Sequence, residues 1–229
     1  MKKSKNRKLI NAYLEKYSLN KYLSESLSLC CELHTFDKNE MICTLNEDMK
    51  YIYFLVKGKA KVYTLLSTGK SLLICFITPL SVMGDIEFLD NSAADCSVKT
   101  IESCHLIAIP IDKVKKLAYD DSVFLRFIIS SLEKKLRNNS IFSSINMLYP
   151  LENRFVSYLL SLPINSNNTV EIDELTHISE LLGSSYRHLN RVIKNLCEKN
   201  LIIKDSNLIT ILNMDELKKL ARDIYKNEK

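Results

Sequence analysis

The stretch GSSYRHLNRVIKNL, residues 183–196, sets hydrogen-bonding side chains among regularly spaced aliphatic residues near the C-terminal end of the chain. Arginine can donate two parallel hydrogen bonds to guanine, asparagine can make an equivalent pair with adenine, and serine and lysine can hold phosphates. This face therefore either contacts nucleic acid or is an ordinary solvated helix surface. Its polar residues are Ser185, Tyr186, Arg187, His188, Asn190, Arg191 and Lys194.

The charge around this stretch favours nucleic acid. Residues 183–204 carry five basic side chains against Glu198 alone, although residues 151–229 as a whole hold eleven basic and eleven acidic side chains. An ordinary exposed helix mixes both signs of charge, whereas a neutral domain with one basic patch has the electrostatic footprint of a nucleic-acid binder. The formal net charge of the chain is +5, and residues 1–8 alone carry five basic side chains.

The elements that must position this face are predicted from the residues around it. The stretch ELTHISELLG has the apolar stripe of a helix and ends at Gly183, the residue type best suited to a left-handed cap. Ser184 or Ser185 can cap a second helix, which would bury Leu189, Val192, Ile193 and Leu196. A hairpin, LIIKDSNLITIL, and a last helix over 214–226 follow. Together these elements predict a winged helix-turn-helix.

Residues 30–110 have a different pattern, which predicts strands. Short apolar or alternating runs are separated by turn residues, and three of the four glycines of the chain stand in these breaks. Six or more strands at this spacing indicate an antiparallel jelly-roll, so the expected fold class is α+β. The runs are MICTL, YIYFLV, AKVYTLL, SLLICFI, CSVKTI and CHLIAIPI.

From about residue 112 the apolar period indicates a long helix, which should end before Pro150. Its seam can either pack on the jelly-roll or pair with a second helix in a dimer, and periodicity leaves both open. The predicted division is a jelly-roll with an N-terminal helix at 1–118, a connecting helix at 119–149 and a winged helix-turn-helix at 150–229. The seam comprises Leu125, Ile129, Leu132, Leu136, Ser140, Ser143 and Met147.

Several function classes find no support in the sequence. The four histidines are dispersed and glycine is scarce, so neither a nucleophile with a base nor a phosphate-binding glycine loop points to an enzyme. The seven cysteines show no CxxC pair; Cys104 with His105, or Cys30 and Cys31 with His34, are weak alternatives as metal ligands, and we expect no metal or other cofactor. No apolar run is long enough for a membrane span or a secretory signal, which predicts a cytoplasmic protein.

The jelly-roll pattern, the long helix and the segment ELTHISELLGSSYRHLNRVIKNLCEKNLI with its hairpin together resemble the Crp/Fnr family of bacterial transcription regulators over essentially the whole chain, and SSYRHL resembles the YeiL-like branch. This resemblance implies a homodimer paired through the long helix, with double-stranded DNA, RNA polymerase and an unidentified small-molecule effector as partners. It implies base reading by Tyr186, Arg187 and Arg191. For Ser185 and His188 it implies phosphate contacts. Tyr186 and Arg187 depart from the nucleotide-responsive members, so we expect a different half-site.

The segment MGDIEFLDNSAADCSVKT, residues 83–100, resembles the phosphate-binding cassette of that family, with Asp85 at the position of a ribose-binding carboxylate. The arginine and serine that neutralise a cyclic phosphate fall on Asp95 and Cys96, or one residue earlier. An aspartate repels a phosphate, so we expect no response to cyclic nucleotides. An alternative function is a small-molecule or thiol-redox sensor in which Cys96 reacts. The candidate effector pocket comprises Gly84, Asp85, Asp95, Cys96, Ser97, Asn139 and Ser140.

Overall fold

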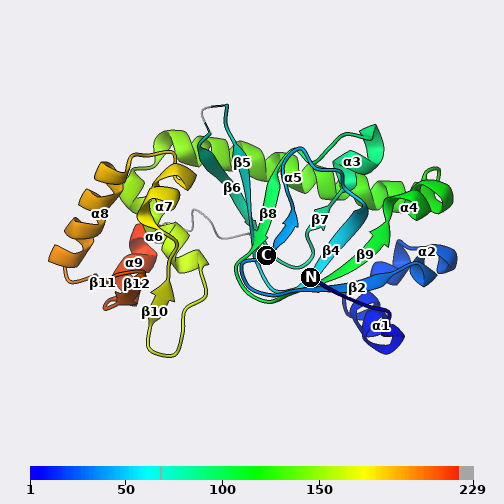
Figure 1. Cartoon of the computed structure of the whole chain (residues 1–229), viewed down its shortest axis with the longest axis horizontal. Helices are drawn as coiled ribbons and strands as arrows, with labels where there is room; N and C mark the ends of the chain where they lie inside the picture. The colour runs from blue at the N-terminus through cyan, green and yellow to red at the C-terminus, as the bar shows by residue number, and fades with distance from the viewer. Residues whose placement is uncertain (68, 222–229) are drawn as a thin grey trace. The chain divides into compact units, whose positions relative to one another are not determined.

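A computed structural model describes residues 1–67 and 69–221, with residues 141–147 described by their backbone only. The fold is α+β, with an N-terminal antiparallel β domain, a long helix and a C-terminal winged helix-turn-helix (Figure 1). The chain divides into two compact units. The first comprises Met1–Val62 and Ile77–Asn138, and the second comprises Tyr63–Phe76 and Asn139–Lys229.

The N-terminal half of the chain forms two sheets, with strand orders β1-β2-β9-β4-β7 and β3-β8-β5-β6. The strands are β1 (Lys2–Ser4), β2 (Glu32–Phe36), β3 (Met41–Cys43), β4 (Tyr51–Lys57), β5 (Ala60–Leu65), β6 (Ser71–Ile77), β7 (Val82–Met83), β8 (Ser97–Thr100) and β9 (Cys104–Pro110). The helical segments are α1 (Arg7–Lys16), η1 (Leu19–Lys21), α2 (Glu25–Leu29), α3 (Asp85–Asp90), α4 (Ile111–Ala118) and α5 (Ser122–Leu148). The six predicted strand segments are all present, and β1, β2 and β7 are additional.

The strand β4 explains why YIYFLV is a continuous apolar run rather than an alternating one. Ile52, Phe54 and Val56 belong to the buried cluster that also holds apolar residues of α1, α2, α4 and α5. Tyr53 lies on the opposite face of the strand, where its ring contacts Phe36 and His34 of β2. Both faces of β4 are therefore covered, and every residue from 52 to 56 is buried.

The helical region that begins near residue 112 is two helices rather than one. Helix α4 ends at Ala118, and α5 starts at Ser122. Asp121 stands between them and caps α5, because its Oδ1 accepts hydrogen bonds from the backbone N–H groups of Val123 at 2.9 Å and Phe124 at 3.2 Å. The C-terminal end of α5 at Leu148 agrees with the limit set by Pro150.

The predicted seam of α5 divides into two adjacent stripes that differ in burial. Leu125 and Leu132 pack against the core of their own domain beside the fully buried Ile128. Ile129 and Leu136 lie on the adjoining stripe, one turn further along, where 63% and 69% of their surfaces are exposed. Two members of the predicted seam thus pack on the core of their own domain, and the part of the seam in pairing two chains stays a prediction. The side chains of Ser143 and Met147 lie outside the described residues.

A buried histidine lies on the face of the first sheet that also carries Tyr53. His34 is 0% exposed, its Nδ1 is 3.3 Å from the hydroxyl of Tyr53, and its Nε2 is 2.9 Å from Oε2 of Glu32. The ring of Tyr51 packs edge-on against it, and Lys3 hydrogen-bonds to that tyrosine. Burial lowers the pKa of His34 below its ordinary value of 6.5 and outweighs the opposing hydrogen bond to Glu32.

The lowered pKa of His34 predicts a loss of stability in acid. The unfolded chain takes up the proton near pH 6.5 while the folded chain still excludes it, so the free energy of unfolding falls as the pH falls below 6.5, until the pH passes the folded pKa. We expect the melting temperature to drop between pH 7.5 and 5.5, and to drop less in a His34→Gln variant. His188→Gln, at an exposed position, should keep the wild-type dependence. Equal slopes for all three proteins would contradict this role of His34.

Candidate nucleic-acid interface

The C-terminal elements follow the predicted order. They are α6 (Leu151–Ser161), β10 (Thr169–Glu171), α7 (Leu175–Leu181), α8 (Tyr186–Glu198), β11 (Ile202–Asp205), β12 (Leu208–Ile211) and α9 (Met214–Ala221). The last helix is described to Ala221, and the remainder of its predicted range, 222–226, lies outside the described residues. The hairpin pairs β11 with β12 in antiparallel register, with Ser206 in its turn at φ +50°, and β10 adds a third strand.

The turn between α7 and α8 follows from two residues. Gly183 has φ +59°, and its N–H donates to the carbonyl of Glu180 at 2.8 Å, which closes the end of α7. Ser185 is the cap of α8: its Oγ accepts the N–H of His188 at 3.2 Å. Ser185, rather than Ser184, is therefore the cap of α8. The Oγ of Ser184 lies 3.4 Å from Nδ1 of His188.

Four aliphatic residues hold α8 in the unit: Leu189, Val192, Ile193 and Leu196 are all buried, as predicted. Polar contacts add to this packing at the C-terminal end of α8. Glu152 of α6 accepts hydrogen bonds from Lys199 at 3.0 Å and Asn195 at 3.5 Å. Arg154 of α6 donates to the carbonyls of Tyr149 and Leu182, which ties α6 to the end of α7. The orientation of α8 is therefore set by its neighbours rather than by its exposed side chains.

Residues 63–76 also contribute to this unit, although they come from the N-terminal half of the chain. Phe76 packs against the fully buried Tyr158 of α6, with 5.9 Å between ring centroids. Tyr63 meets His177 of α7 edge-on at 6.4 Å. Sequence analysis missed this contribution because β5 and β6 are strands by pattern and give no sign of contacts with helices more than 80 residues later.

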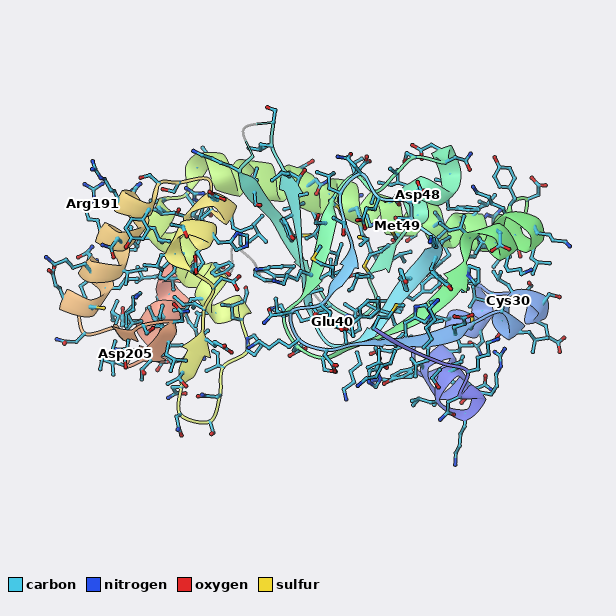
Figure 2. All side chains as sticks on the ribbon, in the orientation of Figure 1. Cys30, Glu40, Asp48, Met49, Arg191 and Asp205 are labelled. Atoms are coloured by element: carbon cyan, nitrogen blue, oxygen red, sulfur yellow. The ribbon has the colours of Figure 1, made fainter. Side chains whose placement is uncertain are left out.

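All seven predicted contact residues are on α8 or at its cap, and all seven are exposed. Within the part of the chain that the structure describes, Arg187 and Arg191 have no hydrogen-bond or ion-pair partner. Arg191 projects from α8 in Figure 2. Lys194 has a weak exposed pair with Glu198, whose nearest N–O distance is 3.7 Å. The first turn of α8 also presents backbone N–H groups and the positive end of the helix dipole, which attract phosphate.

The residues of the candidate effector pocket differ in burial and belong to both units. Gly84 and Asp85 begin α3, and an added Cβ at Gly84 would lie 2.6 Å from the carbonyl oxygen of Tyr51, so this position accepts no side chain. Ser97 is buried and accepts a hydrogen bond from the N–H of Leu45 at 3.0 Å. Asp95 is exposed. Asn139 and Ser140 are exposed residues of the second unit.

The candidate pocket also contains a residue that sequence analysis missed. The Nζ atom of Lys135, on α5, lies 2.6 Å from Oδ1 of Asp85. These two residues are fifty positions apart, and no pattern in the sequence connects them. The same neighbourhood contains Cys96, and burial raises the pKa of its thiol to about 11, which leaves little reactive thiolate at neutral pH. The raised pKa of Cys96 thus does not support the thiol-redox alternative.

Among the helices within residues 1–67 and 69–221, none is both long and apolar enough to cross a membrane. Over the same described residues, no group of three or more histidine, cysteine or acidic side chains is placed to hold a metal ion.

Comparison with known proteins agrees with both halves of the fold. Residues 33–121 match the model of the cyclic nucleotide-binding domain, and residues 153–220 match that of the Crp-like helix-turn-helix domain. Regulatory protein YeiL of Escherichia coli O157:H7 is 28% identical over 192 residues, which cover 84% of this chain and 86% of that protein. A Global nitrogen regulator of a Nostoc species is 22% identical over 189 residues, which cover 78% of this chain and 84% of that protein.

Solved structures show the same fold at low sequence identity. A transcriptional regulator of the Crp/Fnr family from Eubacterium rectale superimposes with a TM-score of 0.74 at 18% identity, covering 92% of this chain and 94% of that one. A regulator of the CRP family from Thermus thermophilus gives a TM-score of 0.67 at 18% identity, covering 84% of this chain and 98% of that one.

Proposed function

The chain belongs to the Crp/Fnr family of transcription regulators, and on that premise we propose that it binds a specific operator as a homodimer. In this proposal the protein acts in the bacterial cytoplasm and does not respond to cyclic nucleotides. In this proposal the sensory jelly-roll is residues 1–118, the dimerisation helix 119–149 and the DNA-binding domain 150–229. The family and the fold are those of transcription regulators rather than enzymes. Contact with RNA polymerase stays a prediction.

The observation that carries the proposal is the exposed face of α8. Arg187 and Arg191 stand one turn apart on a helix that its own unit holds firmly, and no described residue neutralises them. A guanidinium held out without a partner is suited to paired hydrogen bonds with guanine in the major groove. Asn190 on the same face can pair with adenine, and Ser185, His188 and Lys194 flank it as phosphate contacts.

Dimerisation is supported by the outer face of α5. Ile129 and Leu136 are seven residues apart, so they lie on one stripe of the helix, and both remain largely exposed. Large aliphatic residues at this spacing on a helix are typical of a pairing surface. Two copies of α8 related by a twofold axis could then read the two halves of a palindromic operator.

The surroundings of Asp85 support indifference to cyclic nucleotides. Asp85 is 1% exposed. The negative charges of Asp85 and Asp95 both raise the pKa of Glu87, so the three carboxylates interact. A cyclic phosphate entering here would meet the carboxylates of Asp85, Glu87 and Asp95, and the ammonium of Lys135 is already paired with Asp85. Like charges that are partly desolvated disfavour such a ligand strongly.

A gel-shift titration tests the proposal. At rising salt concentrations the affinity for a random duplex should fall steeply, because the basic face of α8 displaces counterions from phosphates. Addition of millimolar cyclic AMP or cyclic GMP should leave the affinity for a promoter-derived palindrome unchanged. An affinity that does not depend on salt would contradict DNA binding through this face, and a shift on addition of nucleotide would contradict the reading of the sensory domain.

A further inference from the structure

The buried carboxylate of Asp85 is the first residue of α3, directly after Gly84, whose backbone lies against the carbonyl of Tyr51. The backbone at the start of α3 therefore places Asp85 in the interior, where it is 1% exposed. Of its two oxygens, Oδ1 meets Lys135, whereas Oδ2 has no hydrogen-bond partner among the described residues. A charge buried in this way is tolerated only if a counter-charge stays close.

Other negatively charged groups near Asp85 increase its need for a positive charge close by. Burial raises the pKa of Glu87, the negative charges of Asp85 and Asp95 raise it further, and Lys135 acts in the opposite direction. The carboxylate of Glu87 raises the pKa of the thiols of Cys43 and Cys96, and the ammonium of Lys135 lowers it. Lys135 thus acts on two carboxylates, those of Asp85 and Glu87.

Lys135 also has a defined place on α5. Ile128, Leu132 and Lys135 follow one another at four and three residues, so they form the inner stripe of the helix. Ile129 and Leu136, seven residues apart, form the outer stripe. Both stripes belong to one rigid helix. Contacts that hold the inner stripe in place therefore also set the orientation of the outer stripe. Lys135 is 38% exposed, so its ammonium can leave Asp85 for water without unfolding the helix.

We propose that Lys135 is a built-in counter-ion of the sensory domain, which neutralises Asp85 and thereby holds α5 in the position that pairs two chains without an external ligand. This inference rests on the proposed function, since it assumes that α5 forms the dimer and that the dimer binds DNA. In this proposal the protein's own ammonium, rather than a bound effector, keeps α5 in place.

The proposal is tested with four variants of the full chain: Lys135→Met, Asp85→Asn, the double variant, and Lys134→Met as the matched control at an exposed neighbouring position. The dimer dissociation constant is measured by sedimentation equilibrium, and the operator affinity by gel shift without added effector. Lys135→Met should weaken both by about tenfold or more, a factor typical of coupling between separate sites. Asp85→Asn should have a smaller effect, because the lysine that remains can reach water.

The double variant is decisive. It should recover to within about threefold of the wild type, because the neutral amide no longer needs a counter-charge. The proposal is overturned if Lys135→Met behaves like Lys134→Met, or if the double variant stays as weak as Lys135→Met. If Lys135→Met does not fold, recovery of a cooperative melting transition in the double variant supports the proposal, and failure to recover overturns it. A wild type that neither dimerises nor binds an operator would instead refute the proposed function.

Discussion

Replacement of Ile129 and Leu136 by glutamate should convert the homodimer into a monomer and lower the affinity for a palindromic operator by about 100-fold or more. Each aliphatic side chain contributes about 1.5–3 kcal/mol when it is buried, and each occurs twice in a symmetric interface. The glutamates also place like charges opposite one another in a desolvated contact. Since both side chains are largely exposed in the single chain, the variant should keep its fold.

Sedimentation equilibrium of this double variant gives the mass directly, and the melting temperature reports on the fold. The control is Lys134→Glu, which introduces a carboxylate at an exposed position of the same helix between the two sites. It should remain dimeric. A double variant that remains dimeric at micromolar concentration would show that the outer stripe of α5 is not the pairing surface.

The second large effect is expected at Arg191. Its replacement by alanine should cost about 1–3 kcal/mol of operator binding and relax the preference at one base pair of each half-site, because a base-reading guanidinium is lost. Lys194→Ala should instead weaken binding to all sequences alike and reduce the salt dependence by about one counterion. The distinction follows from the geometry, since Arg191 has no partner on α8 whereas Lys194 is paired with Glu198.

Gel shifts against a set of operators with single base changes separate the two roles. Lys218→Ala, which removes one exposed positive charge from α9 of the same unit, is the control and should bind like the wild type. A loss at Arg191→Ala that is uniform across all sequences would make Arg191 a phosphate contact and remove its part in specificity.

The features predicted correctly from sequence are those with local causes. Gly183 and Ser185 set the turn and the cap of α8 through their own backbone and hydroxyl, and the stripe ending at Leu196 needs only the period of the helix. The strand β2 was missed because its sequence ELHTF contains a buried histidine, whose partner Tyr53 lies 19 residues away. Helix α3 was missed because six residues are too few to show a period.

The remaining errors and omissions concern contacts between distant residues. Ile128 and Ile129 are adjacent apolar residues, so the sequence does not say which of them faces the core of the domain; the structure buries Ile128 and exposes Ile129. The ion pair of Asp85 with Lys135 joins two helices of the first unit and has no local signal. In both cases the tertiary fold determines the result: which isoleucine is buried, and which lysine pairs with Asp85. The local sequence does not determine either one.

The central claim is that the exposed face of α8 reads DNA sequence. Its most direct measurement is selection of bound duplexes from a random pool, followed by gel-shift titration of the selected duplex and a scrambled duplex at physiological salt. A palindromic consensus bound at least about 1,000-fold more tightly than the scrambled duplex is the predicted result. Equal affinity for the two duplexes would contradict the claim.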